Sequence, residues 1–162
     1  MSGGLRNEVL LRHLRELTLS PNSQANTIKK APKLYFFDTG LVAHLTKYSS
    51  PEILMNGAIN GSILENYVVS EIIKTYTNNG LEYYAHYYRD IDSKEVDMIL
   101  ESDGRLHPLE IKKTASPSTA LTSAFKVLDK ASVPRGTGAV ICTKKELSAL
   151  DKGTMIVPVW AL

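Results

Sequence analysis

The amino-acid sequence predicts one α/β domain in which helices flank a mixed sheet, with a helical extension before it. Three observations indicate this fold class. Apolar residues follow helical spacing over residues 62–78, three segments with alternating apolar residues lie between residues 81 and 113, and helix-like and strand-like segments then alternate to the C-terminus. A chain of 162 residues, 43% of them hydrophobic, is long enough for one sizeable core.

The N-terminal part, residues 1–30, is predicted to be a helical extension and linker that precedes a domain over residues 31–162. A helix is expected over residues 5–19, because three leucines have the spacing of one helical face: Leu10, Leu14 and Leu17. The segment "SPNSQANTIKKAP" follows, and its Pro, Asn and Ser residues favour turns.

The domain is predicted to begin with "KLYFFDTGLVAHL", a short aromatic strand, a turn and a helical piece. Asp38 stands before Thr39 and Gly40, where its side chain most simply makes the turn or caps the helix. A functional role for Asp38 is the alternative.

A longer helix is predicted over residues 62–78 and ends at Asn78-Asn79-Gly80, because Asn and Gly tolerate the left-handed conformation of a helix end. Three strands follow in "LEYYAHYYR", "EVDMILE" and "RLHPLEIKK". The remaining segments are a helix in "STALTSAFKVLDKA", a strand in "GAVICT", a short helix in "KKELSAL" and a last strand in "TMIVPVW". The predicted order after Gly61 is therefore α-β-β-β-α-β-α-β.

Asp103-Gly104 is the strongest hairpin signal in the chain, because a type I′ turn needs positive φ at both central residues. A two-residue turn at this point sets the register of the hairpin. One face is then largely apolar and consists of Val96, Met98, Leu100, His107, Leu109 and Ile111. The other face places Asp97 opposite Glu110 and Glu95 opposite Lys112.

This register predicts a chemical site on the second face. Directly opposed carboxylates, with Cβ atoms about 4.5–5.5 Å apart, destabilise a sheet unless solvent, a shared proton or a cation offsets their repulsion. Asp97 and Glu110 therefore suit a divalent metal with oxygen ligands, such as Mg²⁺. Lys112 lies on the same face as Glu110 and would orient a water nucleophile or stabilise a charged transition state. The alternative is a solvated strand face with weak cross-strand ion pairs.

Glu65 lies near the start of the long helix and has two readings. Ser62-x-x-Glu65 has the form of a capping box, in which the glutamate closes the helix N-terminus. The same carboxylate is also near Val69 and Ile72, on the side expected to face the sheet, where it would approach Asp97 and Glu110.

The bulk properties restrict the function classes. No apolar run approaches the roughly 20 residues of a membrane helix, no signal peptide is recognisable, and a cytoplasmic location is expected. The single cysteine, Cys142, excludes an intramolecular disulfide and a zinc cluster of several thiolates. The net charge of +2 is compatible with nucleic-acid binding without arguing for it.

Other polar groups have a nucleic-acid reading beside a plainer one. The basic clusters Lys29-Lys30-Lys33 and Lys112-Lys113 are solvated faces or nucleic-acid contacts. Arg89 is expected in a surface ion pair, with a phosphate contact as the alternative. Four tyrosines between residues 83 and 88 would stack on bases, although alternation places half of them in the core: Tyr83, Tyr84, Tyr87 and Tyr88.

Taken together, Glu65 on a helix, Asp97 on a strand and Glu110-Ile111-Lys112 on the next strand resemble the PD-(D/E)XK nuclease superfamily, which has the restriction endonuclease-like fold. The resemblance implies an α-β-β-β-α-β core. It also implies that Asp97, Glu110 and Glu65 bind Mg²⁺ or Mn²⁺ and that Lys112 assists catalysis. The proline of the superfamily motif is not present, since Val96 precedes Asp97.

Four blocks, "KAPKLYFFDTGLVAHL", "GSILENYVVSEIIK", "YYRDIDSKEVDMIL" and "LEIKKTASPS", together with the closing "IVPVWAL", are similar to the C-terminal domain of bacterial and archaeal AAA+-type ATPases, domain-of-unknown-function family 4143. This resemblance implies a nuclease-like domain joined to an upstream ATPase domain. The chain contains no G-x-x-x-x-G-K-[ST], so we expect no ATP hydrolysis from it.

Three functions therefore compete. The first is a metal-dependent phosphodiesterase acting on nucleic acid, with DNA as the expected substrate and RNA as the alternative, and with Asp97, Glu110, Glu65 and Lys112 as its catalytic residues. The second is a non-catalytic module that binds nucleic acid or protein and regulates the ATPase. The third is a structural oligomerisation domain, since a homo-oligomer is compatible with the sequence.

Overall fold

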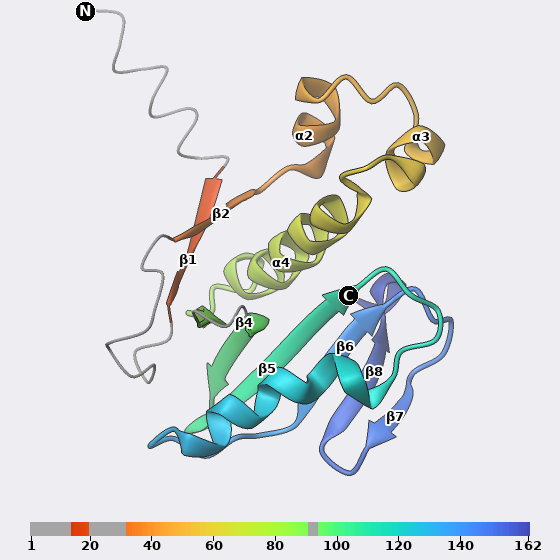
Figure 1. The fold of residues 1–162 in the computed structure, drawn as a ribbon. Helices are drawn as coiled ribbons and strands as arrows, with labels where there is room; N and C mark the ends of the chain where they lie inside the picture. The colour runs from red at the N-terminus through yellow and green to blue at the C-terminus, as the bar shows by residue number, and fades with distance from the viewer. Residues whose placement is uncertain (1–13, 20–31, 91–93) are drawn as a thin grey trace, which may run out of the picture.

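The structure, a computed structural model, describes residues 14–19, 32–90 and 94–162 and has a mixed α/β fold (Figure 1). Eight strands follow the order β2-β1-β3-β4-β5-β6-β8-β7. The strands are β1 (Leu14–Leu19), β2 (Lys33–Phe36), β3 (Tyr84–Arg89), β4 (Glu95–Ser102), β5 (Arg105–Lys112), β6 (Gly138–Cys142), β7 (Ser148–Asp151) and β8 (Thr154–Pro158). The helices are α2 (Thr39–Leu45), α3 (Pro51–Asn56), α4 (Asn60–Asn78) and the 3₁₀ helices η1 (Thr119–Lys130) and η2 (Val159–Ala161).

Six neighbouring strands form the body of the sheet: β3, β4, β5, β6, β8 and β7. This body is mixed, as the sequence predicts. β3, β4 and β5 are antiparallel neighbours, β5, β6 and β8 are parallel to one another, and β7 closes the sheet antiparallel to β8. β1 joins this body through two parallel pairs with β3 and holds β2 antiparallel on its other side.

Helices cover both faces of the sheet. Met98 and Ile99 are neighbours on β4 and therefore point to opposite faces. Met98 lies in the cluster built on α4 with Val68, Val69 and Ile73, whereas Ile99 packs with Phe125 of η1. Figure 1 shows α4 and the helix between β5 and β6 on different sides of these strands. The sheet is therefore the middle layer of three.

α4 confirms the long helix predicted over residues 62–78, with a start two residues earlier. Gly80 after it has a φ of 68°, the left-handed conformation expected from the Asn-Asn-Gly sequence. None of the helices that the structure describes is both long and apolar enough to cross a membrane.

The prediction of a helix over residues 5–19 is wrong for the part that the structure describes. Leu14–Leu19 is strand β1, paired with β2 and β3, while residues 5–13 of the predicted helix lie outside the described residues. Helical spacing of leucines was the only local signal, and long-range pairing overrides such a propensity because β1 satisfies the backbone groups of two strand edges at once. The proposed boundary at residue 30 remains a prediction.

The short helix predicted in "KKELSAL" is also wrong. Its second half is strand β7, which pairs with β8 through Ser148↔Ile156 and Ala149↔Met155. Leu147, which supplied part of the helical pattern, is exposed. Pairing with the available edge of β8 determines the conformation of this segment. The seven residues of the segment do not by themselves reveal that edge. The remaining predicted strands and the helices before β3 are confirmed, while the α-helix predicted before β6 is present as the 3₁₀ helix η1.

Candidate functional site

The site begins with the hairpin of β4 and β5, whose predicted turn and register are confirmed near the turn. Asp103 and Gly104 have φ values of 50° and 67°, as a type I′ turn requires. The paired residues run from Ser102↔Arg105 to Met98↔Leu109. The ladder ends there, so the prediction that Asp97 and Glu110 form a directly opposed pair is wrong.

Beyond the last ladder pair, a hydrogen bond from a backbone amide of β5 to a side chain of β4 connects the two strands. The amide N–H of Ile111 donates to Asp97 Oδ2 at 2.8 Å, and both groups are buried. The neighbouring β3–β4 ladder has a bulge at the same level, between His86 and Tyr88. A bulge changes the alternation of a strand, and Val96 accordingly packs with Ile99 on the η1 side rather than with Met98. The single apolar face predicted for Val96, Met98 and Leu100 is thus wrong at Val96.

The diverging strands still bring three of the predicted site residues together. Lys112 Nζ lies 2.9 Å from Glu110 Oε1 and 3.8 Å from Asp97 Oδ2. Both carboxylates are almost fully buried, while the Lys112 side chain is 46% exposed. One amine therefore bridges the two acids and remains accessible from solvent.

Glu65, the fourth predicted residue, approaches this group through a lysine. Its Oε1 accepts from Lys33 Nζ at 2.9 Å and from the Tyr35 hydroxyl at 2.6 Å. The capping-box reading is wrong, because α4 begins at Asn60, before Ser62, and its N-cap has no side-chain hydrogen bond. Glu65 instead faces β2 from the first turns of the helix.

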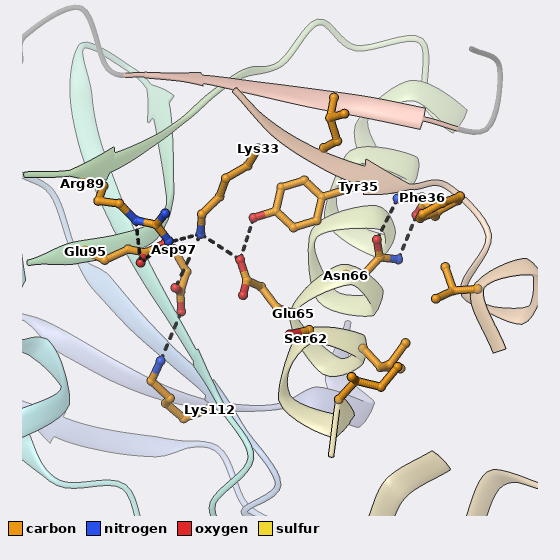
Figure 2. Close-up of a pocket in the computed structure, with 14 residues that line it drawn as sticks. Lys33, Tyr35, Phe36, Ser62, Glu65, Asn66, Arg89, Glu95, Asp97 and Lys112 are labelled. Atoms are coloured by element: carbon orange, nitrogen blue, oxygen red, sulfur yellow. Dashed lines mark hydrogen bonds and ion pairs between the residues drawn. The ribbon is translucent and has the colours of Figure 1, made fainter. Parts of the chain in front are cut away.

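Lys33 is the main site residue that the sequence does not reveal, since its place in the cluster Lys29-Lys30-Lys33 predicts a solvated face or a nucleic-acid contact. Its Nζ forms ion pairs with Glu65 and Glu95 and lies 3.9 Å from Asp97 Oδ1. The Lys33 side chain is only 16% exposed. Figure 2 shows its ammonium pointing between the three carboxylates, with Lys112 on the far side of Asp97.

Glu95 also departs from its expected pairing with Lys112. Besides Lys33 it contacts Arg89, which donates to Glu95 Oε2 from Nε at 3.0 Å and from Nη2 at 2.7 Å. Arg89 therefore forms the ion pair expected of it. The site contains four carboxylates and three cations: Glu65, Glu95, Asp97 and Glu110 with Lys33, Arg89 and Lys112.

Burial and the unequal number of charges determine the protonation of the acids. Burial raises the pKa of Glu110 to about 7, and the negative charge of Asp97 adds to the shift. Burial also raises the pKa of Asp97, with the charge of Glu65 as the second cause. For Lys33, burial lowers the pKa, but the charge of Glu65 and hydrogen bonds to Glu95 and Glu65 outweigh it, so the pKa is raised. Lys33 is therefore charged. The site has one cation fewer than carboxylates, so the negative charges of Asp97 and Glu110 are not fully neutralised.

One amide side chain of α4 bonds both backbone groups of a residue in β2. Asn66 of α4 is buried; its Oδ1 accepts from the Phe36 N–H at 2.7 Å, and its Nδ2 donates to the Phe36 carbonyl at 2.9 Å. These two bonds fix the strand that supplies Lys33 and Tyr35.

We expect Asn66→Ala to lower the free energy of unfolding by about 1–3 kcal/mol, because both backbone groups of Phe36 lose their partner. Urea unfolding measures this effect. Asn56→Ala, which removes one exposed hydrogen bond to Glu52, is the matched control and should cost clearly less. Equal losses in the two variants would contradict the role of Asn66.

A cavity of about 510 Å³ lies beside the charged cluster, between β2 and the start of α4, and opens to solvent. Lys33, Glu65, Asp97 and Lys112 contribute to its wall (Figure 2). Glu110 is not among the described residues that line it. A substrate in this cavity would therefore meet Asp97 and Lys112 directly and Glu110 only behind them.

The donor set partly fits a hard divalent cation. Carboxylate oxygens are the ligands that Mg²⁺ and Mn²⁺ prefer, and the raised pKa values of Asp97 and Glu110 indicate that further positive charge would be favourable there. Within the described ranges, however, no three His, Cys, Asp or Glu side chains come together as a metal-binding group. Lys33 stands between Glu65 and Asp97 instead.

Among the other polar groups, Asp38 takes the plainer of its two readings. Asp38 caps α2 by accepting from the amides of Gly40 and Leu41. Tyr87 is buried and Tyr84 is exposed. His107, predicted on the largely apolar face of the hairpin, is only half-buried, and its Nδ1 lies 3.0 Å from the Thr137 carbonyl.

Comparison with known proteins places the chain in a family. Residues 60–162, more than half of the chain, match the family described as "Domain of unknown function (DUF4143)". The chain is a member of the DUF4143 family. The match includes Glu65, Asp97, Glu110 and Lys112, while Lys33 precedes it.

Two curated proteins are similar to this DUF4143 chain, an uncharacterized protein of Mycobacterium bovis and one of Mycobacterium tuberculosis. Each is 28% identical over 101 residues, which is 62% of this chain and 22% of the relative. The chain thus spans about a fifth of the length of these relatives. No solved structure matches the chain significantly.

Proposed function

We propose that Asp97, Glu110 and Lys112 form a divalent-metal-dependent site that hydrolyses phosphodiester bonds of nucleic acid, within a PD-(D/E)XK-like domain. One observation supports this most strongly. At the point where β4 and β5 separate, the Lys112 amine lies 2.9 Å from one buried carboxylate and 3.8 Å from another, and it remains accessible from the cavity. An ordinary cross-strand ion pair does not explain two buried acids with raised pKa values.

In this proposal Asp97 and Glu110 would hold Mg²⁺ or Mn²⁺. When bound, such an ion polarises a phosphate oxygen and lowers the pKa of a coordinated water. Lys112 orients the attacking water, or donates to the phosphate oxygen on which negative charge develops. The Ile111 N–H orients Asp97, because its hydrogen bond holds the carboxylate at the point where β4 and β5 separate.

We also propose partners for this site. The similarity to the C-terminal domain of AAA+-type ATPases suggests that an upstream ATPase domain presents nucleic acid to the cavity. The curated relatives are several times longer than the matched segment, which leaves room in them for such a domain. DNA as the substrate, a cytoplasmic location and a homo-oligomer remain predictions from the sequence.

A second function is favoured by the position of Lys33. An ammonium that already pairs with Glu65 and Glu95 and lies 3.9 Å from Asp97 neutralises much of the acidic cluster. A non-catalytic module that binds nucleic acid or a partner without metal would need no more than this. The two functions predict different responses to Mn²⁺.

Calorimetric titration with Mn²⁺ and a cleavage assay on labelled DNA and RNA test the proposal. We expect the wild-type chain to bind Mn²⁺ and to cleave. Asp97→Asn should lose both properties, because it removes a ligand. Lys112→Met should lose at least about 100-fold in cleavage while still binding Mn²⁺, because it removes only the donor at the transition state.

The exposed Glu146 offers a matched control, since Glu146→Gln changes one carboxylate that does not line the cavity and should leave both properties unchanged. Metal-independent binding of nucleic acid with no cleavage, unaffected by Asp97→Asn, would reject the nuclease and support the non-catalytic module.

A further inference from the structure

Lys33 has the contacts of a bound cation rather than of a surface lysine. Its ammonium contacts carboxylates from two different elements, Glu65 of α4 and Glu95 of β4, and a third, Asp97, lies within 3.9 Å. The ring centroid of Tyr87 lies 5.6 Å from Nζ, which adds a cation–π contact. This number of partners fixes the ammonium in one place.

The strand that supplies Lys33 is itself held in position. β2 is anchored to α4 by the two hydrogen bonds between Asn66 and Phe36. Tyr35, two residues after Lys33 and so on the same side of β2, donates to the same Glu65 oxygen that Lys33 contacts. Glu65 thus receives two donors from one strand.

A divalent ion and this ammonium would compete for Glu65. Metal–oxygen distances are about 2.0–2.2 Å for such ions, so an ion on Glu65 Oε1, the oxygen that Lys33 contacts, would lie within about 5 Å of Nζ, where like charges repel strongly in a buried site. At Asp97 and Glu110 the neighbouring ammonium is that of Lys112, whose Nζ lies 2.9 Å from Glu110 Oε1 and 3.8 Å from Asp97 Oδ2. The Lys112 side chain is 46% exposed, against 16% for Lys33, so it can turn toward solvent when an ion binds, whereas Lys33 is held in place.

We infer that Lys33 is a built-in cation that takes the place of a metal ion at Glu65, so that Glu65 is no metal ligand and the site holds one divalent ion, on Asp97 and Glu110. This inference deepens the proposed function and rests on it for the ion at Asp97 and Glu110. The positive charge of Lys33 beside Asp97 then remains in the site whether or not a metal ion is bound.

Four proteins test the inference by calorimetric titration with Mn²⁺: wild type, Glu65→Gln, Lys33→Met and the double variant Lys33→Met/Glu65→Gln. We expect wild type and Glu65→Gln to bind one ion with similar affinity. Lys33→Met should bind Mn²⁺ at least about tenfold more tightly or bind a second ion, because Glu65 becomes available. The double variant should lose that gain.

Two results would overturn the inference. One is a fall of about tenfold or more in Mn²⁺ affinity in Glu65→Gln alone, which would make Glu65 a ligand beside Lys33. The other is a Lys33→Met protein without the gain. Lys33→Gln, which keeps a hydrogen-bond donor and removes the charge, should show the same gain and serves where Lys33→Met fails to fold, as judged by circular dichroism.

The inference and the proposed function fail in different ways. If the wild-type chain binds no Mn²⁺, the nuclease proposal fails at Asp97 and Glu110. A gain in Lys33→Met that depends on Glu65 would still identify Lys33 as the internal cation. Conversely, normal Mn²⁺ binding by wild type without any gain in the Lys33 variants would overturn the inference and leave the proposed function standing.

Discussion

Replacing Lys33 with methionine is expected to lower the free energy of unfolding by about 3–5 kcal/mol near neutral pH, because removing one partner of a buried ion pair leaves uncompensated buried charge. Glu65 and Glu95 would lose an ion-pair partner, and Asp97 would lose the positive charge near its Oδ1. Since the Lys33 side chain is 16% exposed, solvent screening should keep the loss toward the lower end of that range.

The loss should depend on pH in a defined direction. The pKa of Lys33 is raised above its usual 10.5, so its stabilising contribution is fully present at neutral pH and is lost only as the pH rises above 10.5. In Lys33→Met, Glu95 and Asp97 lose a positive charge that lowers their pKa values, so they take up protons more readily, and the deficit should shrink as the pH falls from 7.5 to 5. Urea unfolding at the two pH values measures it.

Lys126, an exposed lysine of η1, gives the matched control. Lys126→Met should change stability by no more than about 0.5 kcal/mol. A loss below about 1 kcal/mol in Lys33→Met at pH 7.5 would mean that the ion pairs of Lys33 are no stronger than surface pairs.

Glu110 should make the protein less stable as the pH rises toward neutrality. Its pKa is raised from 4.5 to about 7, so between these values the folded protein holds a proton that the unfolded chain has released. Stability is therefore lost as the pH rises through this window, at up to about 1.4 kcal/mol per pH unit and by about 3 kcal/mol in total.

Glu110→Gln removes this dependence. The variant is expected to be more stable than wild type above pH 7, by up to about 3 kcal/mol, with a difference that disappears near pH 4. Unfolding midpoints between pH 4 and 8 measure the two curves, and the difference between them isolates Glu110 from other titrating groups. Glu146→Gln should run parallel to wild type. Parallel curves for Glu110→Gln would show that this carboxyl titrates normally.

The parts of the fold that the sequence predicts correctly depend on local signals. Asp103-Gly104 sets the turn, and alternation along β4 and β5 sets the register over the five pairs next to it. Gly80 marks the end of α4 because few other residues adopt its backbone conformation readily. Such features need only a few neighbouring residues, and one sequence suffices to predict them.

The errors arise where distant segments decide the conformation. β1 and β7 are strands because free strand edges are available to them, and those edges come from other parts of the chain. The opposed pair of Asp97 and Glu110 fails because β4 has a bulge, which alternation over a few residues does not reveal.

The candidate site was predictable in its residue types and not in its charge balance. Glu110 and Lys112 are two residues apart on one strand, so their contact follows from strand geometry. Lys33 lies 32 positions before Glu65, and only the docking of β2 on α4 brings them together. A lysine at the start of an aromatic strand is the one signal in the sequence, and its neighbours Lys29 and Lys30 make it resemble part of a solvated cluster.

The hydrogen bond from the Ile111 N–H to Asp97 gives the domain an internal spectroscopic probe. An amide that donates to a carboxylate changes its chemical shift and its solvent exchange when that carboxylate gains a proton or a ligand. The NMR signal of the Ile111 amide thus reports whether Asp97 is charged, protonated or bound to a ligand, without a probe placed in the cavity.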